Sequence, residues 1–237
     1  MGVYMDYNSI NKKIDKLNTK YEYNGNKGYV PYNLSEVRNF KIYRGTIPIL
    51  LSAPHAVVQY RNSAVKEADE YTGAIVEYLC QKTGAWGIIR EWYAKDDPNY
   101  NSGRRSTFYR DSIVKLIEQN NIYLLLDIHG YSKKNHINIA SKKIVVGTGF
   151  GKNINRNINL NREFIEVFGD ELIFDKPFSA TLPNNVSSYA HSKTGISAYQ
   201  CELEKICRIP SRERVEMLEK LSDFISDVSE TYEVKTK

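Results

Sequence analysis

The sequence is poor in the residues that define several classes of protein. Its 237 residues include 3 cysteines, 2 tryptophans and 4 histidines. Three cysteines cannot all pair, and none forms a CxxC motif, so we expect reduced structural thiols and a cytoplasmic protein. No apolar run approaches the length of about 18 residues that spans a bilayer, and the first residues lack the apolar stretch of a signal peptide. The sequence therefore predicts no membrane partner and no secretion by that route.

Charge of either sign is also limited. The 33 Lys and Arg residues against 28 Asp and Glu residues give a net charge of +5, without a basic block. This mild balance permits an anionic substrate and does not indicate a nucleic-acid partner. The glycine loop GTGFGKN (147–153) lacks both GxxxxGK[ST] and GxGxxG, so nucleotide binding is not predicted.

No repeat or low-complexity linker divides the chain, so we expect a single domain over residues 1–237. Residues 1–40 are polar and rich in Tyr and Asn, which predicts an N-terminal extension with one helical turn and irregular structure. The core is expected at residues 41–230. Near its end, residues 211–228 carry apolar side chains at helical spacing, which predicts an amphipathic helix followed by a frayed tail.

Between these ends, apolar strand-like runs alternate with segments of helical periodicity. Strands are expected at 45–54, 86–93, 121–130 and 195–203, and helices at 71–84, 105–121 and 153–170. The alternation predicts an α/β fold, a three-layer αβα sandwich with a mostly parallel, mixed central sheet. In such sheets, functional residues gather at the carboxyl ends of the strands.

Two of the four histidines lie at the ends of predicted strands. His55 follows the first strand, and His129 ends the third. Their equivalent places suggest a shared site, and zinc binds His nitrogens together with carboxylate oxygens. The nearest acids, Glu67, Asp69 and Glu70, lie at the start of the following helix. They are candidate ligands, although acids at a helix start are also stabilised by the helix dipole.

Further acids lie at the ends of predicted strands. Asp127 comes two residues before His129, where it can orient the imidazole or cap the strand. Glu202 and Glu204 lie on one face of the last strand, and Glu202 is a candidate general base. The alternative for both is an edge strand with its acids in water. Because HExxH and an HxxE pair at His55 are absent, any ligand set must come from separated segments.

Five short motifs, taken in order, carry a resemblance to a known family. They are SAPHA (52–56), EADEYTGAIVEYL (67–79), DPN (97–99), LLLDIHG (124–130) and AYQCELEK (198–205). Together they resemble the N-formylglutamate amidohydrolase family, which are zinc hydrolases related to carboxypeptidase-like metallopeptidases. The resemblance implies a phosphorylase/hydrolase-like form of the predicted sandwich, Zn²⁺ as the cofactor and hydrolysis of an amide.

The resemblance also implies roles for individual residues. His55, Asp69 and His129 would be the zinc ligands, with Glu67 the rival of Asp69. Glu202 would be the general base. The nucleophile would be water activated by zinc.

The Asp-x-Asn motif, Asp97 and Asn99, would shape the substrate cleft. The family continues this motif with Arg, whereas Tyr100 follows here. The family also places an Arg shortly before the Asp, where this sequence has Lys95, and a lysine cannot form the two parallel hydrogen bonds that a guanidinium makes to a carboxylate. Several cations outside the motif are candidates for substrate binding: Arg104, Arg105, Arg110 and His191, which is expected in a loop before the last strand. Solvated charge is the alternative for the three arginines.

The substrate class stays open between a small anionic formyl-amino acid and a peptide-like molecule. Hydrolysis of γ-glutamyl or other peptide-type amides is an alternative activity, and a non-catalytic binding relative with the same fold is another. The sequence predicts neither the oligomeric state nor the native metal. Zinc content separates an enzyme from a binding protein, and substrate screening separates the two enzymatic alternatives.

Overall fold

The computed structural model describes residues 6–26, 39–61, 64–93, 96–100 and 107–236. The helices are α1 (Tyr7–Asn26), α2 (Thr72–Thr83), α3 (Phe108–Gln119), α4 (Asn161–Phe168), α5 (Val186–Thr194) and α6 (Arg212–Thr236). The strands are β1 (Phe40–Tyr43), β2 (Ile47–Ala53), β3 (Gln59–Arg61), β4 (Ala64–Lys66), β5 (Ala85–Arg90), β6 (Leu124–Tyr131), β7 (Ile144–Gly147), β8 (Leu172–Phe174) and β9 (Ser197–Glu204).

The described strands form one large mixed sheet and a small hairpin. The large sheet has the order β1-β5-β2-β6-β9-β7-β8. Its central strands β5, β2, β6 and β9 are parallel, while β1 is antiparallel to β5 and β7 is antiparallel to β9. Strands β3 and β4 pair separately as an antiparallel hairpin. The predicted mostly parallel, mixed sheet is therefore confirmed.

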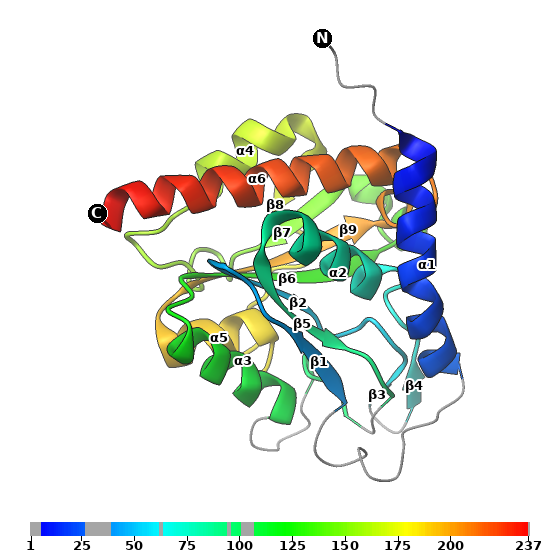
Figure 1. Cartoon of the computed structure of the whole chain (residues 1–237), viewed down its shortest axis with the longest axis horizontal. Helices are drawn as coiled ribbons and strands as arrows, with labels where there is room; N and C mark the ends of the chain where they lie inside the picture. The colour runs from blue at the N-terminus through cyan, green and yellow to red at the C-terminus, as the bar shows by residue number, and fades with distance from the viewer. Residues whose placement is uncertain (1–5, 27–38, 62–63, 94–95, 101–106, 237) are drawn as a thin grey trace.

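Helices cover both faces of this sheet, as Figure 1 shows. Helices α1, α2, α4 and α6 lie on one face, and α3 and α5 lie on the other. Along β2, Ile49 and Leu51 belong to the core cluster of the first face, and Leu50 belongs to that of the second. Burial on both faces explains why the sequences of these strands are nearly continuous apolar runs. The three-layer αβα sandwich is confirmed.

Most predicted elements are present, and one predicted helix begins much later than expected. The four predicted strands are β2, β5, β6 and β9, and the first two predicted helices are α2 and α3. The helix predicted over 153–170 is shorter and corresponds to α4. Two asparagine side chains before it accept hydrogen bonds from nearby backbone amides. Oδ1 of Asn155 accepts from the Asn157 backbone amide at 2.9 Å, and Oδ1 of Asn159 accepts from that of Asn161 at 3.0 Å. Such local bonds compete with helix formation.

The N-terminal segment contains a longer helix than the single turn expected there. Helix α1 has 20 residues and packs against α2 and α6. Ile14 and Tyr21 are buried, and Ile10 and Leu17 are partly buried beside them. Their spacing of four, three and four residues is a helical stripe within a polar composition.

The C-terminal helix is also longer than expected. Helix α6 continues to Thr236 through the segment predicted to fray. The ring of Tyr232 stacks on that of Tyr123 with centroids 3.6 Å apart. This aromatic contact gives the last turns of the helix a partner in the residue directly before β6.

Two expectations drawn from sequence composition can be compared with the structure. Cys80, Cys201 and Cys207 are buried free thiols, and burial raises the pKa of Cys80 and of Cys207 to about 12. They are structural thiols, as predicted. None of the helices in the described part of the chain has the length and apolar character that crossing a bilayer requires.

Candidate metal centre

The predicted site lies where three parallel strands end. In the sheet register, Ser52 of β2 pairs with Asp127 of β6, and His129 of β6 pairs with Glu202 of β9. Paired residues on neighbouring strands point to the same face of a sheet. Asp127, His129 and Glu202 therefore share one face, and His55 lies two residues beyond the end of β2.

The segment between His55 and α2 is fixed by its backbone. The Asp69 amide donates to the His55 carbonyl at 2.9 Å, and the Thr72 hydroxyl donates to the Asp69 carbonyl at 2.8 Å. Tyr71 has a left-handed φ of 69°, and α2 starts without a side-chain cap. The Asp69 carboxylate is therefore not used as a helix cap and turns towards the two histidines.

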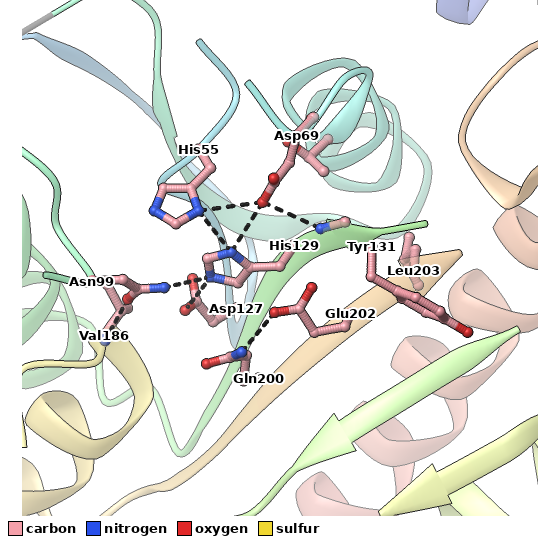
Figure 2. A network of polar contacts seen from close by, with 12 residues as sticks. His55, Asp69, Asn99, Asp127, His129, Tyr131, Val186, Gln200, Glu202 and Leu203 are labelled. Carbon is pink, nitrogen blue, oxygen red and sulfur yellow. Dashed lines mark hydrogen bonds and ion pairs between the residues drawn. The ribbon is translucent and has the colours of Figure 1, made fainter. Parts of the chain in front are cut away.

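Three ligand-type atoms converge in this region, as Figure 2 shows. Nδ1 of His55 lies 3.1 Å from Nδ1 of His129, and each nitrogen lies 3.2 Å from Oδ2 of Asp69. In a tetrahedral zinc site with bonds of about 2.0–2.1 Å, ligand atoms lie about 3.3 Å apart. The His–Asp–His set therefore fits a zinc-like divalent ion. The rival acid Glu67 is exposed and does not belong to the cluster.

Each imidazole is oriented by a carboxylate on its far side. Nε2 of His55 donates to Oδ1 of Asp97 at 2.8 Å, and Nε2 of His129 donates to Oδ2 of Asp127 at 2.9 Å. A proton held on Nε2 leaves the lone pair of Nδ1 directed at the cluster. Asp127 thus occupies the orienting position considered for it. Asp97, expected to shape the cleft, is buried behind His55 instead.

The charges of the cluster depend on one another. Burial alone would raise the pKa of Asp69, but hydrogen bonds with His129 and His55 outweigh it and hold that pKa well below its usual range. Burial alone would lower the pKa of His129, but Asp127 and Asp69 hold it well above the usual value. Two ring nitrogens and a carboxylate oxygen in mutual contact need positive charge among them. Either a proton or a metal cation supplies it.

The candidate base Glu202 is held beside this cluster on β9. Its side chain is buried, and Oε1 accepts a hydrogen bond from Nε2 of Gln200 at 2.7 Å. Gln200 in turn accepts a hydrogen bond from the amide of Asn185. Burial raises the pKa of Glu202, and the charge of Asp69 adds to this effect against the opposing effect of His129. A carboxyl group with a raised pKa can both accept and return a proton near neutral pH.

The neighbouring acid Glu204 has a different role. Its Oε2 accepts a hydrogen bond from the Ile206 amide at 2.7 Å, which caps the short helical turn after β9. Glu204 is buried, so it is not an edge-strand acid in water.

The candidate ligands and the candidate base border one cavity of about 370 Å³. Asn99 also lines it, close to His129 and to the start of α5. Nδ2 of Asn99 lies 2.9 Å from Nε2 of His129, and Oδ1 accepts a hydrogen bond from the Val186 amide at 2.8 Å. A second cavity of about 970 Å³ adjoins the first, and Lys66, Asp69, Gly130 and Phe178 border both.

Of the other candidate substrate-binding residues, those that the structure describes lie away from this cavity. Arg104 and Arg105 lie outside the described residues. Arg110 is buried, where Nη1 donates to the Asn184 carbonyl at 2.5 Å. His191 lies on α5, not in a loop, and its Nδ1 donates to the Ile196 carbonyl at 2.7 Å. It borders a separate small cavity, so its expected place in the cleft is not supported.

Sequence reasoning missed a packing contact that supports the centre. The Gly130 amide donates to Oδ2 of Asp69 at 3.2 Å, and a Cβ atom at this glycine would lie 2.3 Å from the Arg208 guanidinium. Arg208 is buried and donates to the carbonyls of Leu203, Tyr131 and Glu70. It therefore ties the ends of β6 and β9 to the Asp69 loop. The glycine directly after His129 was the available signal.

Comparison with solved structures finds chains of similar fold. At 11% sequence identity, N-formylglutamate amidohydrolase from Ralstonia eutropha JMP134 superposes with a TM-score of 0.59, over 81% of this chain and 97% of its own. The gene product Atu2144 from Agrobacterium tumefaciens gives 0.56, also at 11% identity, over 84% and 97%. No protein-family model matches this sequence. No curated protein matches it either. At this identity, the likeness establishes the shared fold.

Proposed function

We propose that this protein is a metal-dependent hydrolase that cleaves an amide bond in a small anionic or peptide-like substrate. The convergence of His55, Asp69 and His129 with Glu202 around one cavity supports this proposal. The donor set of two nitrogens and one oxygen suits Zn²⁺. A bound zinc ion supplies Lewis-acid chemistry, which lowers the pKa of water and polarises a carbonyl oxygen.

The residues of the chain have distinct parts in the proposed reaction. His55, Asp69 and His129 hold the ion, and Asp97 and Asp127 fix the imidazole orientations. Glu202 accepts the proton of the attacking water and returns it to the leaving nitrogen. Its hydrogen bond from Gln200 fixes the carboxylate in place. N-formyl-amino acids are the first substrates to examine, because the structure of an N-formylglutamate amidohydrolase shares this fold.

Peptide-type amides, including γ-glutamyl peptides, are the second candidate substrates. The adjoining cavity of about 970 Å³ supports them, because it shares Asp69 and Gly130 with the cavity of the candidate centre. A formyl-amino acid needs only the smaller cavity, whereas a peptide extends further.

The test combines metal analysis with one carboxylate substitution. The purified protein is expected to contain about one zinc ion per chain and to hydrolyse formyl-amino acids or γ-linked peptides. Glu202→Gln is expected to retain the metal and lose about 10²- to 10⁴-fold in kcat. Glu204→Gln is the matched control on the same strand and is expected to keep both.

Three results would count against this assignment. Normal turnover by Glu202→Gln would exclude Glu202 as the base. Bound zinc without hydrolysis of either substrate class would favour a non-catalytic binding protein. Absence of any bound divalent ion after zinc reconstitution would remove the basis of the proposal.

A further inference from the structure

The candidate base Glu202 is connected to helix α5 through two amide side chains. Along β9, Ala198 belongs to the core cluster on the α3 and α5 side of the sheet, together with Val186 at the start of α5. Residues two apart on a strand share a face, so Gln200 and Glu202 lie on the same side as Ala198. The first turn of α5 therefore meets β9 beside the candidate base.

Asn185, the residue before α5, is oriented by the backbone of that helix. Its Oδ1 accepts a hydrogen bond from the Ser187 amide at 2.9 Å and lies 3.5 Å from the Ser188 amide nitrogen. Backbone N–H groups only donate, so the atom that faces them must be the carbonyl oxygen of the Asn185 side chain. The Nδ2 group therefore points away from the helix, and it donates to Oε1 of Gln200.

The orientation of Asn185 decides that of Gln200. Because Oε1 of Gln200 faces the Asn185 amide group, Nε2 is the atom that faces Glu202, and it donates to Oε1 of Glu202 at 2.7 Å (Figure 2). All three residues are 6 to 7% exposed, so protein partners rather than bulk water set these orientations. Burial raises the pKa of Glu202, and the hydrogen bond from Gln200 is among the effects that oppose this rise. A turned Gln200 amide would present an oxygen to Glu202 and lose that effect.

We propose that Asn185 is a positioning residue that sets the direction of this hydrogen-bond chain, so that Glu202 receives a donor and is held in its proton-accepting form. The inference rests on the proposed role of Glu202 as the base and deepens it. The backbone of α5, acting through Asn185, decides which end of the Gln200 amide the base meets. Asn185 acts on the base through Gln200.

Two substitutions that keep the helix cap separate this role from simple packing. Asp and Ser cap a helix about as well as Asn, so Asn185→Asp and Asn185→Ser are expected to keep the urea midpoint and the zinc content of the wild type. The carboxylate introduced by Asn185→Asp can only accept, so Gln200 must turn to donate to it and then presents Oε1 to Glu202. Asn185→Ser removes the donor without imposing the turned state.

The order of the two kinetic effects tests the proposal in the zinc-loaded, full-length protein. Asn185→Asp is expected to lower kcat about 10- to 100-fold at pH 7 with KM within about threefold of the wild type, because Glu202 then meets an acceptor and keeps its proton. Asn185→Ser is expected to lower kcat by about tenfold at most. The deficit of Asn185→Asp is expected to shrink as the pH rises and Glu202 ionises, whereas that of Asn185→Ser is not. Packing alone predicts the reverse order, because Asp has the shape of Asn, and a loss in Asn185→Asp no larger than that in Asn185→Ser would overturn the proposal.

A matched control makes the same exchange elsewhere. Asn159 is exposed, and its Oδ1 also accepts a hydrogen bond from a backbone amide, that of Asn161. Asn159→Asp is therefore expected to match the wild type in kcat and KM at every pH. A loss like that of Asn185→Asp would assign the effect to added negative charge in general and overturn the proposal.

Neutron diffraction from crystals of the full-length protein tests the chain without relying on activity. The deuterons on Nε2 of Gln200 are expected to face Glu202 in the wild type and the introduced carboxylate in Asn185→Asp. If the wild type hydrolyses no substrate but shows this orientation and this change, the proposed amidase function fails and the direction of the chain stands. Deuterons that face Asn185 in the wild type, or that face Glu202 in both proteins, would overturn the inference.

Discussion

The two imidazoles of the candidate centre present the same nitrogen to the cluster but are held differently. His129 is held by Asp127, two residues earlier on β6, and the carboxylate of Asp127 is fully buried. His55 is held by Asp97, which lies 42 residues away in the chain, beyond the end of β5. Asp97 also binds Arg61 at the edge of the cavity. The supporting carboxylate of His129 therefore lies within the sheet, whereas that of His55 comes from a segment outside it.

This difference separates two tasks within one site. Asp127 is surrounded by the sheet and its helices, so its charge acts on His129 with little screening. The charge of Asp97 is shared between His55 and Arg61, a cation that borders the cavity. We therefore expect the pair of His129 and Asp127 to contribute most to metal affinity. We expect the pair of His55 and Asp97 to connect the metal with the bound substrate.

Removing either imidazole is expected to have the largest effect on metal binding and hydrolysis, whichever carboxylate supports it. His55→Ala and His129→Ala are each expected to lose bound zinc and about 10³-fold or more of hydrolysis together, because both nitrogens belong to the ligand set. Metal content by elemental analysis and kcat/KM on the best substrate measure this. His191→Ala, on α5, is the control and is expected to retain both. Full zinc occupancy in either cluster variant would contradict the ligand assignment.

Exchanging the two supporting carboxylates for amides compares the halves directly. Asp127→Asn is expected to weaken zinc binding about 100-fold and Asp97→Asn about 10-fold, because the charge of Asp97 is partly neutralised by Arg61. Titration against a chromophoric chelator measures both affinities. Asp223→Asn, an exposed acid on α6, is the control. A larger effect at Asp97 would reverse the proposed division of tasks.

The pH dependence of metal binding sharpens the comparison further. The pKa of His129 is raised, so in the metal-free protein its proton persists to a higher pH than on an ordinary imidazole, whose pKa is about 6.5. Zinc affinity is expected to fall about tenfold for each pH unit below that raised pKa. Because Asp127 causes most of the rise, Asp127→Asn is expected to move the fall to lower pH, and Asp97→Asn is not. Affinities measured from about pH 5 to about pH 9 test this, and equal profiles would contradict it.

The smallest expected effect concerns the packing behind His129. Gly130→Ala places a methyl group against the Arg208 guanidinium and is expected to lower the free energy of unfolding by about 1–3 kcal/mol. Urea denaturation of the metal-free protein measures it. Unchanged stability would mean that Arg208 moves without losing its bonds to the ends of β6 and β9.

Local patterns were sufficient for much of the fold. Strands β2 and β6 are apolar runs long enough to be recognised, and their ends place His55 and His129 together. Helix α1 was missed because its stripe is diluted by polar residues, although Ile14 and Tyr21 have helical spacing. Helix α5 was missed because its composition is polar. Its signals were an asparagine cap, Asn185, and the left-handed Gly195 at its end.

Contacts between segments that are distant in the chain could not be predicted from the sequence. Asp97 lies in a recognised motif, but its position behind His55 depends on how the chain folds beyond β5. Nothing near Arg61 in the chain indicates that it meets Asp97 and Tyr100. Such side chains are brought together by tertiary packing, which has no period along the sequence.

The hydrogen bond between the Asp69 amide and the His55 carbonyl closes the intervening segment into a loop with a fixed base. The β3–β4 hairpin belongs to that loop, and we expect changes in its length and charge to leave the base in place. We therefore expect an exchange of this hairpin to change the rim of the cavity while the backbone that holds His55 and Asp69 stays in place. Loop grafting at residues 57–67 is the natural entry point for engineering the protein.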